Sequence, residues 1–206
     1  MNVLEQIREI KLVPVVTFKN LEEVEKTLNA LEAGDVNCAE ICFRTECAPD
    51  AIKIALEKYP NMLIGAGTVI NKKQAIEAIS LGVKFIVSPG FSEDVYQECF
   101  ANNIPYLPGV VTPTEIMNAL EHGINVVKFF PAGLYGGLKA INALGAAFPK
   151  VKFMPTGGVD NTNLVDFVKS SKVWACGGSW LVKGSYEEIK NICLEARKIV
   201  KENKND

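Results

Sequence analysis

Two regularities in this sequence predict an α/β fold made of parallel strands. Short apolar runs rich in β-branched residues recur about every 20 to 26 residues, the length of one strand followed by one helix. Amphipathic stretches separate these runs, and no long linker or low-complexity segment interrupts the alternation. The predicted strands, in chain order, are Leu12–Thr17, Ala39–Arg44, Leu63–Thr68, Phe85–Pro89, Tyr106–Val111, Val126–Pro131, Lys152–Gly157 and Val173–Leu181. We therefore expect a helical crossover between each strand and the next.

Closure of these strands into a barrel is favoured over an open, doubly wound sheet. The runs number eight, and polar residues gather at or near their carboxyl ends: Arg44, Thr68, Ser88, Thr112, Lys128, Thr156 and Ser179. An open sheet would spread these side chains along a line, whereas a closed barrel brings them to one mouth, where barrel enzymes place their chemistry. The predicted architecture is a single (β/α)₈ TIM barrel that occupies residues 1–206 as one domain.

The stretches between the strands have helical periodicity. Leu21, Val24, Leu28 and Leu31 share one helical face. A second apolar face near the C-terminus contains Tyr186, Ile189, Cys193, Ala196 and Val200. Gly34 and Gly82 follow two of the helices, at positions where a left-handed glycine commonly ends a helix.

Composition excludes several classes of protein. The chain is 48% hydrophobic, but no run approaches the roughly 18 apolar residues of a membrane span. Residues 1–5 do not begin a signal peptide. The formal net charge of −2 provides no overall basic field for nucleic acid. A soluble cytoplasmic enzyme is the expectation.

The cysteines are expected to be reduced thiols rather than disulfides or metal ligands. There are six of them in a chain without a secretory signal. Cys38, Cys42 and Cys47 lie close together in sequence, but no CxxC pair occurs and His122 is the only histidine. We therefore expect no metal site and small buried cysteines that fill gaps in the core.

Lys128 is the strongest candidate for a nucleophile. It stands inside an apolar strand between two valines and two phenylalanines, and strand alternation places it on the same face as Val126 and Phe130. If that face is the barrel interior, burial disfavours the ammonium form and favours the free amine that attacks a carbonyl. The alternative is a lysine that reaches out to solvent or forms a purely structural ion pair.

The second predicted strand supplies partners for this lysine. Glu40, Cys42 and Arg44 alternate with apolar Ile41 and Phe43, so a carboxylate and a guanidinium are expected to point inward. A buried glutamate needs a cation, and Lys128 is the natural one. Arg44, nearer the mouth, has the fork geometry to hold a substrate carboxylate. A structural ion pair of Glu40 with either cation is the alternative.

Glycines at three strand ends indicate a ligand site. Thr68 follows Gly65-Ala66-Gly67, where small residues let a ligand approach and the hydroxyl can donate to a carboxylate. Gly157 with Gly158, and Gly177-Gly178 with Ser179, end the last two strands. Phosphate sites of barrels cluster in the loops after these strands, and paired glycines expose backbone N–H groups. Tight turns that require positive φ are the alternative.

Taken as a set, these motifs resemble one known family. They are Glu40-Ile41-Cys42-Phe43-Arg44-Thr45-Glu46, Gly65-Ala66-Gly67-Thr68-Val69, Ser88-Pro89-Gly90, Lys128-Phe129-Phe130-Pro131-Ala132, Pro155-Thr156-Gly157-Gly158 and Gly177-Gly178-Ser179-Trp180-Leu181. In this order and spacing the chain is similar to the 2-keto-3-deoxy-6-phosphogluconate (KDPG) / 4-hydroxy-2-oxoglutarate (KHG) aldolase family over essentially its whole length.

The resemblance implies a class I, Schiff-base aldolase on a (β/α)₈ barrel, usually a homotrimer, that needs no cofactor. Lys128 would form the Schiff base and Glu40 would act as general acid and base. The resemblance further implies that Arg44 and Thr68 bind the pyruvate moiety and that Pro89 and Phe130 line the pocket. Phosphate binding would fall to Gly157, Gly158, Gly178 and Ser179. The expected partner is a small phosphorylated keto acid.

Two stretches differ from the family's pattern, so the sequence does not decide between several substrates. The first strand ends Val16-Thr17-Phe18, without an arginine that some members have there, and the link Val182–Ser185 is shorter than in some relatives. The alternatives are the galactonate-derived epimer or unphosphorylated KHG as substrate. A phosphosugar isomerase or epimerase barrel without covalent catalysis, or a catalytically silent barrel that binds a phosphorylated ligand, would share the glycine loops.

Overall fold

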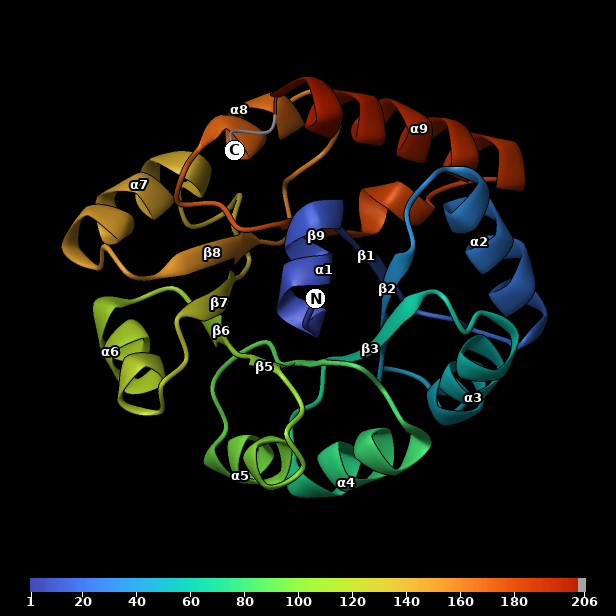
Figure 1. The fold of residues 1–206 in the computed structure, drawn as a ribbon, viewed down its shortest axis with the longest axis horizontal. Coiled ribbons are helices and arrows are strands. Elements are labelled where there is room, and N and C mark those ends of the chain that lie inside the picture. The colour runs from blue at the N-terminus through green and yellow to red at the C-terminus, as the bar shows by residue number, and fades with distance from the viewer. Residues whose placement is uncertain (204–206) are drawn as a thin grey trace.

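The computed structural model describes residues 1–203 and has the predicted α/β architecture, with parallel strands inside and helices around them (Figure 1). The strands are β1 (Leu12–Val16), β2 (Cys38–Cys42), β3 (Leu63–Gly67), β4 (Ile86–Val87), β5 (Tyr106–Leu107), β6 (Gly109–Val110), β7 (Val126–Phe129), β8 (Lys152–Pro155) and β9 (Cys176–Gly178). The helices are α1 (Val3–Ile10), α2 (Glu22–Ala33), α3 (Ala48–Lys58), α4 (Lys72–Leu81), α5 (Glu93–Ala101), α6 (Pro113–Glu121), α7 (Gly137–Ala147), α8 (Leu164–Lys169), the 3₁₀ helix η1 (Ser179–Val182) and α9 (Tyr186–Asn203).

The strands form two parallel sheets. One has the order β5-β4-β3-β2-β1-β9 and the other β6-β7-β8. Two isolated parallel bridges, Phe153 with Val173 and Thr156 with Gly177, connect the β8 and β9 ends of the two sheets. At the other junction, the predicted strand Tyr106–Val111 is divided into β5, in the first sheet, and β6, in the second. Pro108 lies between them and has no backbone N–H to donate to a neighbouring strand.

Alternation along the strands divides the buried residues into two layers. One cluster consists of residues from strands, or from the segments just before them, in both sheets: Val13, Cys38, Leu63, Phe85, Val87, Leu107, Met154 and Trp174. Helix α1 packs on this cluster with Ile7, and Val3 and Leu4 lie against it. The second, larger cluster lies between the strands and the outer helices. The first cluster is therefore an inner core, and α1, at the centre of the view in Figure 1, packs on it.

Several local expectations need correction. Helix α1 was not predicted; it begins at a capping box in which Asn2 and Glu5 bond each other's backbone N–H. The strand expected over Val173–Leu181 is short, because the chain turns into η1 at Ser179. The apolar face of α9 is buried as expected, except that Tyr186 is only partly buried.

The two helix-ending glycines behave differently. Gly82 has the expected left-handed conformation, with φ of 95°. Gly34 does not, since its φ is −86° and Asp35 takes the left-handed position with φ of 61°. A β-carbon at Gly34 would collide with the β-carbon of Cys193 in α9. Gly34 therefore permits close helix packing, not a turn.

Residues 1–203 contain no helix whose length and apolar character would suit a bilayer crossing. The predicted domain extends to residue 206, and residues 204–206 lie outside the part that the structure describes.

Candidate active site

Lys128 and Glu40 meet between the inward faces of the two sheets. Lys128 lies in β7 and Glu40 in β2, and Nζ of the lysine is 3.2 Å from Oε1 of the glutamate. Lys128 is 3% exposed and Glu40 is fully buried. Lys128 lies two residues after Val126 in β7, and Glu40 lies two residues after Cys38 in β2, so each side chain points to the same side as its neighbour. Cys38 belongs to the inner core and Val126 packs against it, so both side chains point inward. The expected pairing of these two residues is present, and neither side chain reaches outward to solvent.

The Glu40 carboxylate is only half satisfied. Oε1 accepts from Lys128, whereas Oε2 is buried and has no hydrogen-bond partner among residues 1–203. An unsatisfied carboxylate oxygen is costly in a buried site. The side chain is confined by Gly67 of β3, where any β-carbon would overlap the carboxylate. This free oxygen can therefore accept a proton or a hydrogen bond from a molecule that enters beside Lys128.

Cys42 adjoins the pair as a neutral thiol. Its Sγ lies 3.9 Å from Oε1 of Glu40. Burial and the neighbouring Glu40 charge raise the pKa of the Cys42 thiol to about 11. Near neutral pH the thiol is therefore protonated and is a poor nucleophile. Lys128 is the group at this site that could attack a carbonyl.

Arg44 and Thr68 lie together just beyond the ends of β2 and β3. Arg44 Nε donates to Thr68 Oγ1 at 2.9 Å. The arginine is exposed, and among residues 1–203 no carboxylate lies within ion-pair distance of it. Its positive charge remains available for an anion. The two residues are next to each other, which the carboxylate-binding prediction requires. Arg44 is exposed, whereas an inward side chain within the strand would be buried.

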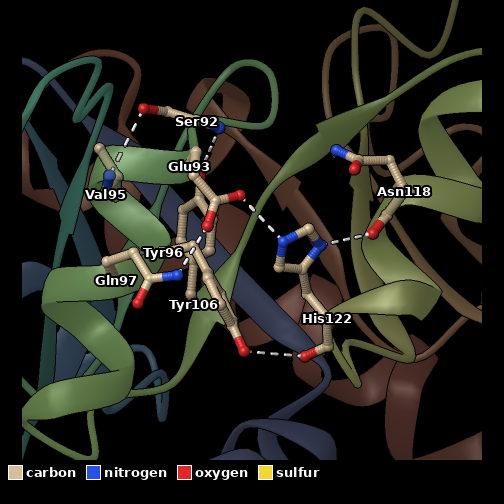
Figure 2. A network of polar contacts seen from close by, with 8 residues as sticks. All are labelled: Ser92, Glu93, Val95, Tyr96, Gln97, Tyr106, Asn118 and His122. Atoms are coloured by element: carbon tan, nitrogen blue, oxygen red, sulfur yellow. Dashed lines mark hydrogen bonds and ion pairs between the residues drawn. The ribbon is translucent and has the colours of Figure 1, made fainter.

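Pro89 is exposed at the end of β4, on a loop that a polar network holds in place (Figure 2). Tyr106 of β5 donates its hydroxyl to the Gly90 carbonyl at 3.3 Å and accepts from the Ser92 N–H at 3.1 Å. Burial raises the pKa of Tyr106, which keeps the hydroxyl protonated for this role. Sequence reasoning missed Tyr106 as a support of the pocket wall.

The same network joins α5 to α6 through the single histidine (Figure 2). His122 Nε2 lies 2.9 Å from Oε2 of Glu93, and Nδ1 lies 2.8 Å from the Asn118 carbonyl oxygen. The ring also lies 4.7 Å from the Phe91 ring and 4.6 Å from the Tyr96 ring, between centroids. His122 therefore serves to pack these helices behind the Pro89 loop.

Phe130 follows β7 and stands next to the lysine amine. Lys128 Nζ lies 5.2 Å from the centre of the Phe130 ring, within the range of a cation–π contact. The phenylalanine is partly buried. It forms an apolar wall beside the amine.

The glycine loops after β8 and β9 lie side by side, but glycine is required for different reasons in the two loops: backbone conformation in the first and close packing in the second. Gly157 and Gly158 have positive φ of 84° and 86°, which other residues rarely adopt. The Thr156–Gly177 bridge brings this loop next to the end of β9. Gly178 has an extended backbone, and a β-carbon there would overlap the Trp180 ring. Ser179 is exposed at the start of η1.

Asn161 ties these two loops to α9, and sequence reasoning missed it. Its Oδ1 accepts from Trp180 Nε1 at 3.0 Å, while its Nδ2 donates to the Ile192 carbonyl at 3.2 Å and to Oε2 of Glu195 at 2.7 Å. One side chain thus joins the loop after β8, η1 and α9. Nothing in the periodicity of the sequence could indicate this contact.

A buried lysine amine beside a carboxylate, with an exposed arginine just beyond the strand of that carboxylate, is the arrangement expected of a lysine-dependent lyase of the aldolase class. The comparisons agree, since the model of the KDPG and KHG aldolase family matches residues 3–194. The chain belongs to this family.

Individual relatives cover nearly the whole chain. The 2-dehydro-3-deoxy-phosphogluconate aldolase of Treponema pallidum is 38% identical over 204 residues, which are 96% of this chain and 97% of the relative. The KHG/KDPG aldolase of Escherichia coli K12 is 39% identical over 191 residues, 90% of each chain. The crystal structure of KDPG aldolase from Legionella pneumophila, with pyruvate captured as a covalent carbinolamine intermediate, is 33% identical with a TM-score of 0.83, covering 97% of this chain and 98% of that one.

Proposed function

We propose that this protein is a class I aldolase that cleaves KDPG to pyruvate and glyceraldehyde 3-phosphate. The observation that carries the proposal is the 3.2 Å contact between buried Lys128 and Glu40. Schiff-base catalysis needs an amine and a proton carrier within reach of the same carbonyl, and this contact supplies both. The named substrate of the Treponema relative and the covalent pyruvate adduct of the Legionella relative support the choice of reaction.

The first half of the reaction forms an imine on Lys128. Lys128 first gives its ammonium proton to Glu40, and the free amine then attacks the C2 ketone of the substrate. The ketone oxygen takes a proton from the attacking nitrogen, which gives the neutral carbinolamine. Glu40 then protonates the carbinolamine hydroxyl, which leaves as water. The product is an iminium ion that can accept the electrons of the C3–C4 bond. The unsatisfied Oε2 of Glu40 supports this role, because an oxygen without a partner is available to substrate or to a catalytic water.

The second half breaks the carbon–carbon bond. Glu40, directly or through a water, takes the proton of the C4 hydroxyl, and the C3–C4 electron pair moves into the iminium. Glyceraldehyde 3-phosphate leaves, and the enamine of pyruvate remains on Lys128. Protonation at C3 and hydrolysis of the imine release pyruvate and restore the amine.

Arg44 and Thr68 are proposed to hold the substrate carboxylate. Their mutual hydrogen bond of 2.9 Å supports this role, because it places a hydroxyl beside a guanidinium without a carboxylate partner. Two anchors on the carboxylate and the covalent bond at C2 would fix the C3–C4 bond perpendicular to the iminium plane. Pro89 and Phe130 would border the carbon chain.

Gly157, Gly158, Gly178 and Ser179 are proposed to bind the phosphate. The adjacency of the loops after β8 and β9 supports this assignment, as does the phosphorylated substrate named for the Treponema relative. KHG is proposed as a second, unphosphorylated substrate, since the Escherichia coli relative carries both substrates in its name.

We also propose that residues 1–206 form one domain whose two sheets act together as a closed (β/α)₈ barrel. The bridges between β8 and β9 and the inner core drawn from around the ring support closure. We propose a homotrimer, for which the exposed Phe100, Met117 and Leu134 provide apolar surface. Six free thiols suit a reducing compartment such as the cytoplasm.

Trapping with pyruvate and borohydride tests the proposal. The wild-type protein should gain the mass of one reduced pyruvate adduct, and peptide mapping should place it on Lys128. Lys128→Ala should neither form the adduct nor cleave KDPG, whereas Lys84→Ala, a matched strand-start control, should do both. A barrel isomerase or a silent binding protein would give no adduct. Rates on KDPG, its galactonate epimer and KHG then decide the substrate preference.

A further inference from the structure

A polar cavity lies at the amino-terminal ends of β1, β7 and β8. Its volume is about 480 Å³, and it is bordered by α1 and by the segments that lead into β1, β7, β8 and β9. Figure 1 shows α1 at the centre of the ring, where it covers this end of the inner core. The volume is in the range of sites for small molecules. None of the residues proposed for catalysis or phosphate binding borders it.

The lining of this cavity is strongly cationic. It includes four basic side chains, Arg8, Lys11, Lys150 and Lys152, and one acidic side chain, Glu5. The Glu5 carboxylate accepts a hydrogen bond from the Asn2 N–H in the capping box of α1. Because the whole chain carries a formal charge of −2, this concentration of positive charge is local to the cavity.

Three of the cations have no carboxylate to neutralise them. Within residues 1–203, no aspartate or glutamate oxygen lies within ion-pair distance of Arg8, Lys150 or Lys152. Like charges gathered around one cavity repel each other, and an anion between them would relieve the repulsion.

Two of the amines are also held in place. Lys152 Nζ donates to the Ser171 carbonyl at 2.6 Å, and Lys11 Nζ donates to the Val173 carbonyl at 3.2 Å. Lys11 is only 7% exposed. Both carbonyls belong to the segment between α8 and β9, so the two lysines are fixed to one wall of the cavity. Less side-chain entropy is lost when such anchored groups bind a ligand.

We propose that this cavity binds a small molecule with two or more phosphoryl groups, at a site separate from the catalytic one. Each phosphoryl group carries about −1.5 to −2 charges near neutral pH, so two groups match the excess of basic residues. A single phosphate would engage only part of the lining. Lys152 donates to one backbone carbonyl, and the other N–H groups of its amine can donate to phosphate oxygens.

Calorimetric titration with pyrophosphate tests the proposal. Pyrophosphate should bind the wild-type protein, inorganic phosphate should bind more weakly, and added salt should weaken both. The variant Arg8→Gln/Lys150→Gln/Lys152→Gln should bind pyrophosphate at least about tenfold more weakly. The control Lys26→Gln/Lys53→Gln/Lys73→Gln, which removes three exposed lysines from helices α2, α3 and α4, should bind like wild type.

A further comparison separates this site from the proposed catalytic phosphate loops. Ser179→Asp should leave pyrophosphate binding at the cavity intact, and the cavity variant should retain aldolase turnover. Unchanged affinity in the cavity variant would overturn the proposal, as would an equal loss in the control variant or a loss confined to Ser179→Asp. If the triple variant does not fold, the single reversal Lys150→Glu at an exposed position should give the same loss.

Discussion

Gly67 of β3 lies so close to the Glu40 side chain of β2 that a β-carbon at position 67 would overlap the carboxylate. The two strands are paired in parallel, with Cys42 opposite Gly67 and Glu40 opposite Gly65. The missing side chain at Gly67 therefore provides the space in which the Glu40 carboxylate turns toward Lys128. The glycine at this position of β3 therefore makes room for the Glu40 carboxylate.

Gly67→Ala should displace Glu40 and reduce turnover while the protein remains folded. A shift of about 1 Å at a catalytic group lowers rates by about 10²-fold. Crowding of the added methyl group should also lower the free energy of unfolding by about 1–3 kcal/mol. The rate of KDPG cleavage and urea unfolding at the same temperature measure the two effects.

Gly65→Ala is the matched control. A β-carbon at Gly65 would meet the buried Phe85 ring and not Glu40. This variant should lose similar stability but keep most of its turnover. Equal loss of turnover in the two variants, once both are shown to be folded, would mean that Gly67 has no special relation to Glu40.

Glu40→Gln should separate imine formation from proton transfer. The amide has nearly the same shape but cannot accept and return protons, so turnover should fall by about 10²–10⁴-fold. Trapping of pyruvate by borohydride should still occur, more slowly, because Lys128 is intact. Rapid-quench measurement of trapping and steady-state cleavage gives both rates; an unchanged cleavage rate would remove Glu40 from the mechanism.

Ser179→Asp should discriminate between phosphorylated and unphosphorylated substrates. The new carboxylate would repel the phosphate at the proposed site, while KHG has no phosphate to repel. The kcat/KM for KDPG should fall by at least about tenfold, the equivalent of one lost charge-assisted hydrogen bond, with little change for KHG. Comparable losses on both substrates would place the phosphate elsewhere.

The contact between Lys128 and Glu40 could be predicted because a buried charged side chain needs a partner of opposite charge. Lys128 and Glu40 each stand in an apolar strand at an inward position, and each needs an opposite charge. Pairing them requires no knowledge of the exact strand geometry, only the parity of the two strands. The α/β class with parallel strands followed from the regular alternation of apolar runs and amphipathic stretches.

The features that the sequence could not predict depend on contacts between distant segments. Gly34 is glycine because α9 passes over it, and Gly178 because the Trp180 ring lies against it. Neither contact is visible in the local sequence, which predicts a left-handed helix end at Gly34. Helix α1 had a local signal in Asn2 and Glu5, but an eight-residue helix owes its stability to packing on the inner core.

The capping box of α6 should make stability depend on Glu115 at neutral pH but not in acid. Burial alone would raise the pKa of this carboxyl, but hydrogen bonds from the Val111 and Thr112 N–H groups and from the Thr112 hydroxyl outweigh it and hold the pKa below its ordinary value of 4.5. The folded state therefore favours the ionised form. Its contribution is present above pH 4.5 and is lost as the pH falls through the lowered pKa of the folded state.

Glu115→Gln should accordingly unfold at a lower temperature than wild type at pH 7, and the difference should shrink as the pH is taken from 5 toward about 3. Glu121→Gln provides the control, since Glu121 is exposed at the end of the same helix. Thermal unfolding of all three proteins across this pH series measures the effect. If the difference in unfolding temperature between Glu115→Gln and wild type stays constant down to the lowest pH, the amide acts by disturbing packing. A loss of the carboxylate's charge would instead matter only at pH values where wild-type Glu115 is ionised.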